Sequence, residues 1–416
     1  MDPERSAEHH EVIVIGAGQV GLAAGHHLAR YGIDHVILEG SDRVGDIWRS
    51  RYDSLKLYSP AKVDSLPGWP FPAAGETFPT GRQMADYLEA YVDRLGLPVR
   101  TGTRVDALAA TDAGSPGYMV SAGQERFLAP RVIIASGAFQ RPHIPEFAAG
   151  LDARIAQVHS AHYRNPGQLP DGPTLVVGVS HSGSDIAYEL AETRPTHLSG
   201  ASHGQLPFSV DSRIGIAAWP VMRAVFSKVL TRDTPMGRKM APKVRRGGGP
   251  LLRVRRQDLL DAGVRWSEAR TVGVTDGKPT LADGTVLEVA SVVWCTGFRP
   301  DYSWIDLAVL DGDGWPAQER GVVSSAPGLY VLGIPFLHSY ASMLVLGAGA
   351  DAEHVVRHIV ASSARPAPSP ARAASSPARS EPVSAAASPR TSARSRQEGA
   401  ASMLPPPRGN ARRTPR

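Results

Sequence analysis

The chain has 416 residues, of which 42% are hydrophobic and 20% are charged. This length suits two or three domains, and the ordinary composition excludes wholesale disorder and a polytopic membrane protein. The net charge of +5 comes from residues 361–416, which hold ten arginines and two glutamates and leave residues 1–360 with a net charge of −3. The globular part therefore has no charge pattern for nucleic acid, and no nucleic-acid partner is expected.

The cysteine content indicates a reducing compartment and excludes a reaction that uses a pair of cysteines. Cys295 is the single cysteine of the sequence, so neither an internal disulfide nor a CxxC redox pair can form. The first ten residues, MDPERSAEHH, lack the basic and apolar regions of a secretory signal. Both observations predict a cytoplasmic protein.

The chain opens with the pattern of a βαβ unit. Residues 12–15 (VIVI) form a short β-branched run that predicts a buried parallel strand. Residues 22–31 predict a helix that Gly32 ends, and residues 35–38 (HVIL) predict a second strand. The three elements span about 30 residues, the usual length of such a unit.

The next hundred residues predict turns, one helix and a meander. Residues 58–80 contain five prolines and are read as turns. Residues 84–95 predict a helix, and residues 99–127 predict a small meander with turns at 112–117. Residues 132–135 (VIIA) predict another buried strand.

A second unit of the same kind begins at Thr174. It comprises a strand at 175–177, a helix at 183–192 and a strand at 196–199, and it makes an internal repeat of a mononucleotide-binding unit. Two Asp-Gly pairs, at 276–277 and 283–284, predict hairpin turns before a strand at 292–294. Residues 350–360 predict a closing helix, and residues 361–416, rich in Ala, Ser, Pro and Arg, predict a disordered basic tail.

One long uncharged stretch resembles a membrane span in length. Residues 322–350 contain no Asp, Glu, Lys or Arg. Two prolines, four glycines and a histidine interrupt it, so a buried strand, a loop and a helix are expected in place of a transmembrane segment.

The first glycine motif predicts a dinucleotide site. Gly16, Gly18 and Gly21 follow a predicted strand and open a predicted helix, and Glu39 ends the next strand. Without side chains, the backbone at Gly16 and Gly18 can approach a pyrophosphate, whose charge the helix N-terminal amides would stabilise. The carboxylate of Glu39 can accept both ribose hydroxyls.

The second motif is a degraded copy of the first. It comprises residues 178–183 (GVSHSG), with Ser180 in the place of the middle glycine. A serine nucleophile elbow is the competing interpretation, but that motif requires glycine at Ser182, and no histidine and aspartate partners can be assigned. A second dinucleotide site is the favoured interpretation.

With these motifs the chain resembles the flavin-containing monooxygenases in their bacterial and plant-like branch, which includes flavoproteins linked to potassium transport. The resemblance covers roughly residues 11–360. It rests on the first glycine motif and on five further segments in the family's order: 44–48 (VGDIW), 51–55 (RYDSL), 135–137 (ASG), 295–300 (CTGFRP) and 328–330 (GLY). The first two resemble segments that line the flavin, the third and fourth resemble the family's two linkers between domains, and the fifth resembles its final flavin-side strand.

The resemblance implies a fold and an activity. The fold is an α/β arrangement of two doubly wound, Rossmann-type dinucleotide-binding domains, with an NAD(P)H domain at 169–296 inserted into an FAD domain at 11–168 and 297–360. The activity is that of an FAD-dependent, NAD(P)H-dependent monooxygenase, in which reduced flavin forms a C4a-peroxide with molecular oxygen and transfers one oxygen atom to a small organic substrate. The cofactors would be FAD and NADPH, with NADH possible.

The motifs and the resemblance together assign two sets of cofactor-binding residues. The flavin set is Gly16, Gly18, Gln19, Gly21, Glu39, Gly45, Ile47, Trp48, Arg51, Leu57 and Val105. The nicotinamide set is Gly178, Ser180, His181, Ser182, Gly183 and His203. No metal site is expected.

Several positions depart from the family pattern. The family's FxGxxxHxxxY motif is reduced to His159 and Tyr163. The asparagine beside the flavin in animal members falls on Tyr58, which is the one candidate for a catalytic side chain. The cation that pairs with the 2′-phosphate of NADPH falls on Ala201, so His203 or Arg213 would have to replace it, and discrimination between NADPH and NADH is expected to be modest.

Other residues have structural interpretations. His354 and His358 are four apart on the closing helix and are read as a solvated face. Cys295 is read as a small buried residue. The basic residues at 253, 255 and 256 are read as a solvated face, and the apolar residues around Trp219 as either the cap of a substrate tunnel or a membrane contact.

Two other functions remain open. One is an NAD(P)H:acceptor flavin oxidoreductase that inserts no oxygen. The other is a redox-sensing or transport-associated flavoprotein with slow turnover. The sequence of the pocket loops does not identify the substrate.

Overall fold

The computed structural model describes residues 7–111 and 117–363. The predicted tail lies outside the described residues except for 361–363, which end the last helix, and the predicted turn at 112–117 lies outside them except for Gly117.

The first part of the fold is built on a parallel five-stranded sheet with the order β19-β8-β2-β3-β4. At its centre β2 (Val12–Ile15) lies between β3 (His35–Leu38) and β8 (Val132–Ile134), and all three strands are buried on both faces. The edge strands are β19 (Leu329–Val331) and β4 (Val99–Arg100). The strands predicted at 12–15 and 35–38 are confirmed residue for residue.

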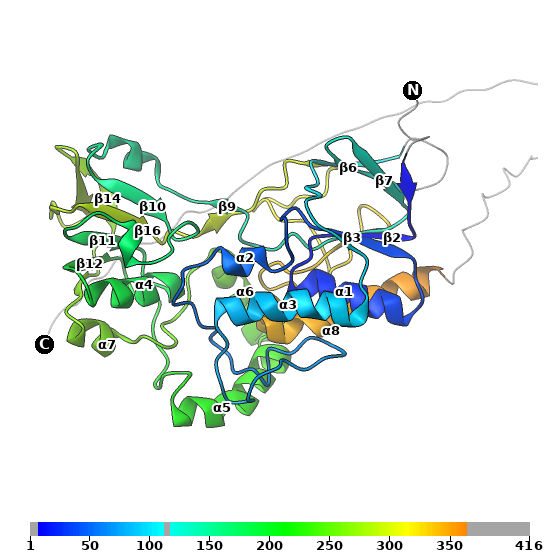
Figure 1. The fold of residues 1–416 in the computed structure, drawn as a ribbon, viewed down its shortest axis with the longest axis horizontal. Helices are drawn as coiled ribbons and strands as arrows, with labels where there is room; N and C mark the ends of the chain where they lie inside the picture. Colours follow the sequence, from blue (N-terminus) through cyan, green and yellow to red (C-terminus); the bar gives the residue numbers. More distant parts are fainter. Residues whose placement is uncertain (1–6, 112–116, 364–416) are drawn as a thin grey trace, which may run out of the picture. The chain divides into compact units, whose positions relative to one another are not determined.

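Three helices pack with this sheet: α1 (Gln19–Arg30), α3 (Gly81–Leu95) and α8 (Val345–Ser363). In Figure 1 they lie together below β2 and β3, and α1 contacts α8. Helix α8 begins at Val345, five residues before the predicted start. One glycine inside the added turn, Gly347, lies close to the preceding backbone, since a Cβ there would be 2.2 Å from the carbonyl oxygen of Ala341. Glycine therefore permits a close approach inside this helix and does not break it.

A second sheet of five strands extends the first part. The strands β5 (Ala107–Ala110), β6 (Tyr118–Ala122) and β7 (Glu125–Ala129) form the predicted antiparallel meander. The short strands β1 (Glu8–His9) and β18 (Ile305–Asp306) add to it in parallel at either edge. The prediction was wrong for residues 99–100, which pair with β3 in the first sheet.

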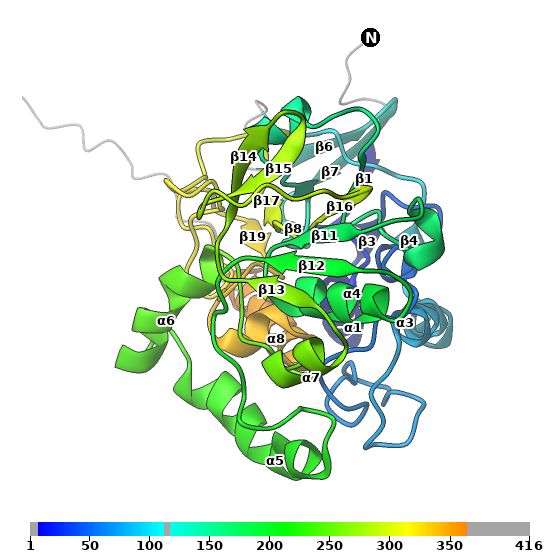
Figure 2. The same cartoon turned by 90° about the vertical axis from the view of Figure 1, so that its left-hand side faces the viewer.

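The second part of the fold has its own parallel sheet, with the order β10-β16-β11-β12-β13. Its strands are β10 (Ala156–His159), β11 (Thr174–Val177), β12 (Thr196–Ser199), β13 (Arg265–Ser267) and β16 (Ser291–Trp294). Figure 2 shows β11, β12 and β13 side by side above α4 (His181–Ala191) and α7 (Arg256–Asp261). The hairpin of β14 (Thr271–Thr275) and β15 (Lys278–Leu281) turns at Asp276 and Gly277, as predicted.

The chain passes between the two parts through a short antiparallel ribbon. It consists of β9 (Arg141–Pro142) and β17 (Phe298–Arg299), and β9 lies between the two parallel sheets in Figure 1. Strand β10 belongs to the second sheet, although the sequence analysis assigned residues up to 168 to the first part. A four-residue strand carries no information about which of two parallel sheets it joins, and only its pairing with β16 decides this.

A helical segment leaves the second part and packs on the first. It comprises α5 (Arg213–Ala224), a π-helical turn at Val225–Val229 and α6 (Pro235–Arg245). The rings of Phe226 and Tyr340 lie 4.7 Å apart, and Phe336 is fully buried beside them. Within this segment Trp219 is buried, whereas Ile214 and Val221 are exposed.

The remaining elements are short. They are α2 (Asp46–Arg49), three 3₁₀ turns at Glu146–Gly150, Pro166–Gln168 and Tyr340–Met343, and the loops between them. The uncharged stretch 322–350 folds as β19, a loop and the start of α8, as predicted. Among the described helices, none has the length and apolar character needed to cross a bilayer.

Candidate functional site

The first glycine loop lies between β2 and α1 and is shaped by backbone contacts. Gly16 has φ +108°, and a Cβ there would lie 2.6 Å from the carbonyl oxygen of Ala135 on the neighbouring strand's end. A Cβ on Gly21 would lie 1.9 Å from the carbonyl oxygen of Gly16. Gly18 is different, because nothing lies within 4 Å of its Cβ position. Gly16 and Gly21 are thus required by the fold, whereas Gly18 faces open space.

Glu39 ties this loop to the next strand. One carboxylate oxygen accepts a hydrogen bond from the amide of Ala17 at 2.8 Å, and the other accepts one from the amide of Ser41 at 2.9 Å. Each oxygen retains a lone pair that can accept a ribose hydroxyl. The N-cap of α1, Gly18, has no side-chain cap, so the first amides of the helix can donate to a phosphate. The loop fits the pyrophosphate and ribose of FAD.

The other residues of the predicted flavin set occupy varied positions. Gly45 has φ +88° and lets α2 approach α3, since its Cβ would meet the backbone of Ala85 at 2.6 Å. Ile47 is about half exposed, and the indole N–H of Trp48 is buried with no partner among the described residues. Leu57 is buried, whereas Gln19 and Val105 are half-buried. The buried N–H of Trp48 is therefore free to donate a hydrogen bond to a bound group.

The second glycine loop repeats the geometry of the first. Gly178 has φ +107°, and its Cβ would lie 2.4 Å from the carbonyl oxygen of Cys295. A Cβ on Gly183 would lie 1.9 Å from the carbonyl oxygen of Gly178, the same distance as in the first loop. Cys295 thus takes the place that Ala135 has in the first loop. Burial raises the pKa of its thiol to about 12, which agrees with the predicted structural role.

Ser180, at the N-cap of α4, does not cap the helix. Its hydroxyl instead accepts a hydrogen bond from the amide of Gly249 at 3.0 Å. His181 follows it, and burial lowers the pKa of this side chain to about 4. Ser182 is half-buried, and His203 is exposed beyond the end of β12. Ser180 therefore leaves the N-terminal amides of α4 uncapped, as Gly18 leaves those of α1.

A buried polar cluster joins the two parts beside this loop. Asp185 on α4 accepts hydrogen bonds from the hydroxyls of Tyr58 at 2.7 Å and Tyr52 at 3.1 Å, and from the guanidinium of Arg253 at 2.6 Å. The ring of Tyr58 also lies 5.0 Å from that of His181. Burial raises the pKa of Asp185, and the charge of Arg253 acts against that rise. Tyr58, predicted near the flavin, thus contacts the second loop.

Sequence reasoning missed Asp185 and was wrong about Arg253. The arginine was read as part of a solvated face, but it forms an ion pair in which the side chain of Asp185 is only 5% exposed. Its neighbour Arg256 is exposed, as predicted. A carboxylate two residues after Gly183, on the buried face of a helix, was the available signal, because such a group requires a partner.

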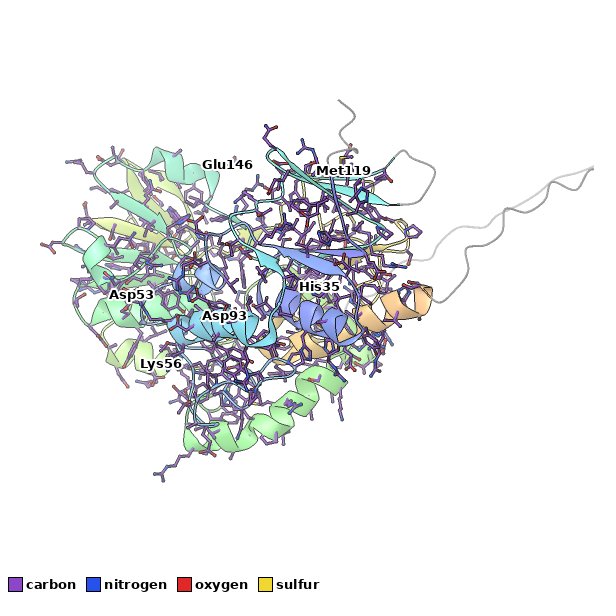
Figure 3. All side chains as sticks on the ribbon, turned by 45° about the vertical axis from the view of Figure 1, so that its right-hand side comes forward. His35, Asp53, Lys56, Asp93, Met119 and Glu146 are labelled. Carbon is purple, nitrogen blue, oxygen red and sulfur yellow. The ribbon has the colours of Figure 1, made fainter. Side chains whose placement is uncertain are left out.

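Arg51 lies where the two linkers meet. Its guanidinium lies 5.5 Å from the ring centre of Phe139 and 5.6 Å from that of Phe298. Burial lowers its pKa, and no carboxylate is among the groups that act on it. The residues that follow Arg51 lie on the segment that borders the second part, where Figure 3 labels Asp53 and Lys56. The carbonyl of Lys56 accepts a hydrogen bond from Arg253 at 3.2 Å.

His159 and Tyr163, the remnants of the family's histidine motif, have structural partners. His159 is buried, accepts from the amide of Ala161 at Nδ1 (3.1 Å) and donates from Nε2 to the carbonyl of Gly297 (3.0 Å). Tyr163 donates to Glu189 on α4 at 2.8 Å. They hold the second linker and α4 in place. His358 is exposed, as predicted, and also contacts the hydroxyl of Tyr330 at 3.2 Å.

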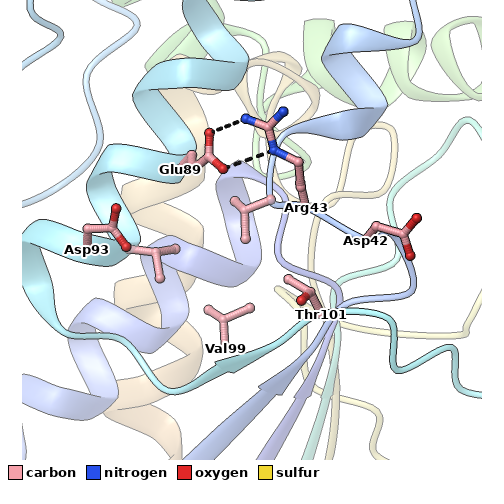
Figure 4. A pocket seen from close by; sticks show the side chains of 8 residues that line it. Asp42, Arg43, Glu89, Asp93, Val99 and Thr101 are labelled. Carbon is pink, nitrogen blue, oxygen red and sulfur yellow. Dashed lines mark hydrogen bonds and ion pairs between the residues drawn. The ribbon is translucent and has the colours of Figure 1, made fainter.

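Two cavities lie away from these loops. One, of about 230 Å³, is lined by α3, β4 and the residues after β3, and the ion pair of Arg43 and Glu89 (2.9 Å) lies beside it (Figure 4). The other, of about 290 Å³, lies between β12, β13 and the segment at 281–287. Neither is lined by a residue of the two glycine loops, so neither is a candidate for the reacting centre.

Comparisons with known proteins agree with this geometry. A family model described as "pyridine nucleotide-disulphide oxidoreductase" matches residues 13–207. A CzcO-like oxidoreductase of Geobacillus kaustophilus (strain HTA426) is 36% identical over 84% of this chain and 98% of the relative. Indole-3-pyruvate monooxygenase YUCCA1 of Oryza sativa subsp. japonica is 28% identical over 86% and 95%. The solved flavin-containing monooxygenase from Stenotrophomonas maltophilia has a TM-score of 0.67 and 28% identity, over 86% of this chain and 100% of that chain.

Proposed function

Because the chain belongs to the flavin-dependent monooxygenase family, which includes the CzcO-like oxidoreductases, we propose that it uses NADPH to reduce FAD and inserts one oxygen atom into a small organic substrate. Reduced FAD, when bound, supplies the reaction with molecular oxygen at C4a. The chain's own residues bind the two nucleotides, orient them and stabilise charge. We also propose a cytoplasmic location, as expected for a chain with one cysteine.

The two glycine loops support an assignment of one nucleotide to each part. We assign FAD to the first part, through the amides of α1, Glu39 and Trp48. NADPH is assigned to the second part, at the N-terminus of α4, where Ser180 and His181 lie beside the amides that would hold its pyrophosphate. We place the boundaries at the β9–β17 ribbon, so that residues 143–297 form the nicotinamide-binding segment.

The observation that carries the choice of acceptor is the state of Cys295. A disulfide reductase of this fold needs a thiolate relay, but this chain has one cysteine, and burial raises its pKa to about 12. Electrons on the flavin therefore have no protein thiol to pass to. This excludes a dithiol relay within the chain, and we propose molecular oxygen as the acceptor because the related proteins include monooxygenases.

Arg51 supports a role at the reacting centre. It is a half-buried cation with no carboxylate partner among the described residues, next to both linkers between the parts. An uncompensated charge in such a place stabilises negative charge that develops nearby. We propose that Arg51 faces the negative charge of the reduced flavin or of the reacting oxygen.

The flavin assignment is tested by Gly18→Val. Because the Cβ position of Gly18 meets no protein atom, the variant is expected to fold and to lose FAD, as its branched side chain fills the path of the pyrophosphate. Flavin absorbance per protein is the measurement. Full flavin content in the folded variant would contradict the assignment.

A matched variant in the second loop is Ser180→Val. It should retain FAD and weaken binding of NADP⁺, because the branched side chain would fill the path of the pyrophosphate. Titration with NADP⁺ measures this. Gly183→Val is a poor choice for this purpose, because its Cβ would lie 1.9 Å from the carbonyl of Gly178 and would disturb the loop itself. Loss of FAD in Ser180→Val would mean that the two loops are not separate sites.

Oxygen insertion is tested by rapid mixing of the reduced protein with oxygenated buffer. A monooxygenase is expected to show a transient flavin–oxygen adduct spectrum, prolonged by NADP⁺, and little free peroxide. Direct reoxidation with stoichiometric peroxide, with or without NADP⁺, would favour the oxidoreductase that inserts no oxygen. Slow reduction by NADPH would favour the redox-sensing flavoprotein.

A further inference from the structure

Residues 246–250 (RGGGP) form a segment fixed at both ends, here called the strap. Before it, Arg245 at the end of α6 forms an ion pair with Asp311 at 2.7 Å. After it, Leu251 is buried, and its amide donates to the carbonyl of Gly204 at 2.9 Å. Between these anchors Gly247 and Gly248 each have φ +81°, a conformation that glycine adopts without strain.

The strap contacts the second glycine loop through Ser180. The hydroxyl of Ser180 accepts from the amide of Gly249 at 3.0 Å and donates to the carbonyl of the same residue at 3.3 Å. This hydroxyl belongs to the position where the dinucleotide motif normally has glycine. The departure from the motif thus has a structural consequence: it gives the loop a side chain that binds the strap.

Two histidines of the predicted nicotinamide set also contact the strap. A Cβ built on Gly249 would lie 2.8 Å from the ring of His181, and one built on Gly248 would lie 2.7 Å from the ring of His203. The strap can lie this close only because it has no side chains there. Ser180, His181 and His203 therefore all lie against the same three-glycine segment.

The strap and a bound dinucleotide need the same side chains. The pyrophosphate of a dinucleotide binds at the N-terminus of the helix that follows the glycine loop, here at Ser180 and His181. The strap reaches both, and through His203 it reaches the end of the site where a 2′-phosphate would bind. We propose that the strap closes the nicotinamide-binding loop, that Ser180 latches it, and that NADPH must displace it to bind.

This inference rests on the proposed binding of NADPH to the second part. Its energetic consequence is that Ser180 lowers nucleotide affinity, because binding must first open the latched strap. The latch consists of neutral hydrogen bonds, so its removal by Ser180→Ala is expected to tighten NADP⁺ binding about threefold to tenfold. A glycine at position 180, as in the complete dinucleotide motif, has no hydroxyl to latch the strap and would not lower nucleotide affinity in this way.

The test combines hydrogen–deuterium exchange with titration on the FAD-bound, full-length protein. Without nucleotide, Ser180→Ala should increase exchange at the amides of residues 246–249, and NADP⁺ should increase it in the parent. Ser184→Ala is the matched control, because that hydroxyl bonds only within α4, to the carbonyl of His181 at 3.0 Å, and it should leave strap exchange unchanged.

A second variant provides an independent result. Gly249→Ala places a Cβ against the ring of His181 and should displace the strap, with the same gain in exchange and affinity. Two results would overturn the proposal. If NADP⁺ reduced exchange in the strap, the strap would clamp the nucleotide and not compete with it. If Ser180→Ala bound NADP⁺ more weakly and left strap exchange unchanged, Ser180 would not latch the strap. Failure of the parent and both variants to bind NADP⁺ or NADPH, with the exchange difference intact, would instead refute the proposed function.

Discussion

Asp64 shows how strongly one buried carboxyl can make stability depend on pH. It is fully buried, one oxygen accepts from the hydroxyl of Ser59 at 2.6 Å, and the other has no partner among the described residues. Burial raises its pKa to about 8, whereas an unfolded chain has a value of about 3.9. The folded protein therefore binds a proton that the unfolded chain releases, and stability falls as pH rises from about 4 to about 8.

Asp64→Asn should remove this pH dependence. The amide cannot ionise, so the variant is expected to match the parent near pH 4 and to melt several degrees above it at pH 8, since each unit of pKa shift corresponds to about 1.4 kcal/mol. Thermal midpoints of the flavin-saturated proteins at both pH values measure this. Asp171→Asn, at an exposed position, is the control, and equal midpoints of Asp64→Asn and parent at pH 8 would contradict the raised pKa.

At the residue scale, the glycine positions could be predicted from the sequence and the polar cluster could not. Gly16, Gly21, Gly178 and Gly183 are read from spacing because each satisfies a local backbone requirement. Asp185 accepts hydrogen bonds from Tyr58 and Tyr52, which lie 127 and 133 positions before it, and from Arg253, which lies 68 positions after it. No sequence periodicity encodes contacts between such distant segments. The strap was missed for the same reason.

At the scale of elements, α4 is held to the first part by the cluster around Asp185. Arg253, 15% exposed, and Asp185, 5% exposed, form a buried ion pair, and two tyrosines from the first part donate to the same carboxylate. Removing one member of such a pair leaves a buried charge without a partner.

Asp185→Ala should therefore destabilise the protein by about 3–5 kcal/mol. Tyr52→Phe, which removes one neutral donor, should cost about 1 kcal/mol. Urea unfolding of the flavin-saturated variants measures both. Arg43→Ala, which breaks the exposed pair with Glu89, should cost at most about 1 kcal/mol, and an equally small loss for Asp185→Ala would show that the cluster does not join the two parts.

Elements with strong local signals could be predicted, and those decided by tertiary contacts could not. The buried runs of β2, β3 and β12 match the prediction residue for residue. Strand β10 was assigned to the wrong part, because its sheet is defined only by pairing with β16. The start of α8 was predicted late, because the sequence does not distinguish a glycine that breaks a helix from one that permits close packing.

At the scale of the whole molecule, the charge and the core belong to different stretches of the chain. Residues 361–416 carry a net charge of +8, whereas residues 1–360 carry −3. The last fully buried residue described is Ile359, which with Val355 and Val356 anchors α8 in the core of the first part.

Ending the chain after Ser363 should therefore leave flavin content and thermal midpoint unchanged, while the net charge changes sign from +5 to −3. Absorbance, calorimetry and binding to an anion exchanger at low salt measure the three properties. Ending the chain before Val355 is the contrasting variant and should prevent folding, since it removes three core residues. A large drop in midpoint after the first truncation would mean that residues beyond 363 contact the core.

The β9–β17 ribbon has a consequence for how such proteins diversify. Arg141 pairs with Arg299 and Pro142 with Phe298, so the chain leaves the first part and returns to it at nearly the same point. Residues 143–297 are in this sense a large insertion within one loop, with both of its junctions side by side. Recombination between related genes can exchange such an insertion as a single piece, and under the proposed assignment of NADPH to it the preference for an electron donor would change separately from the flavin chemistry.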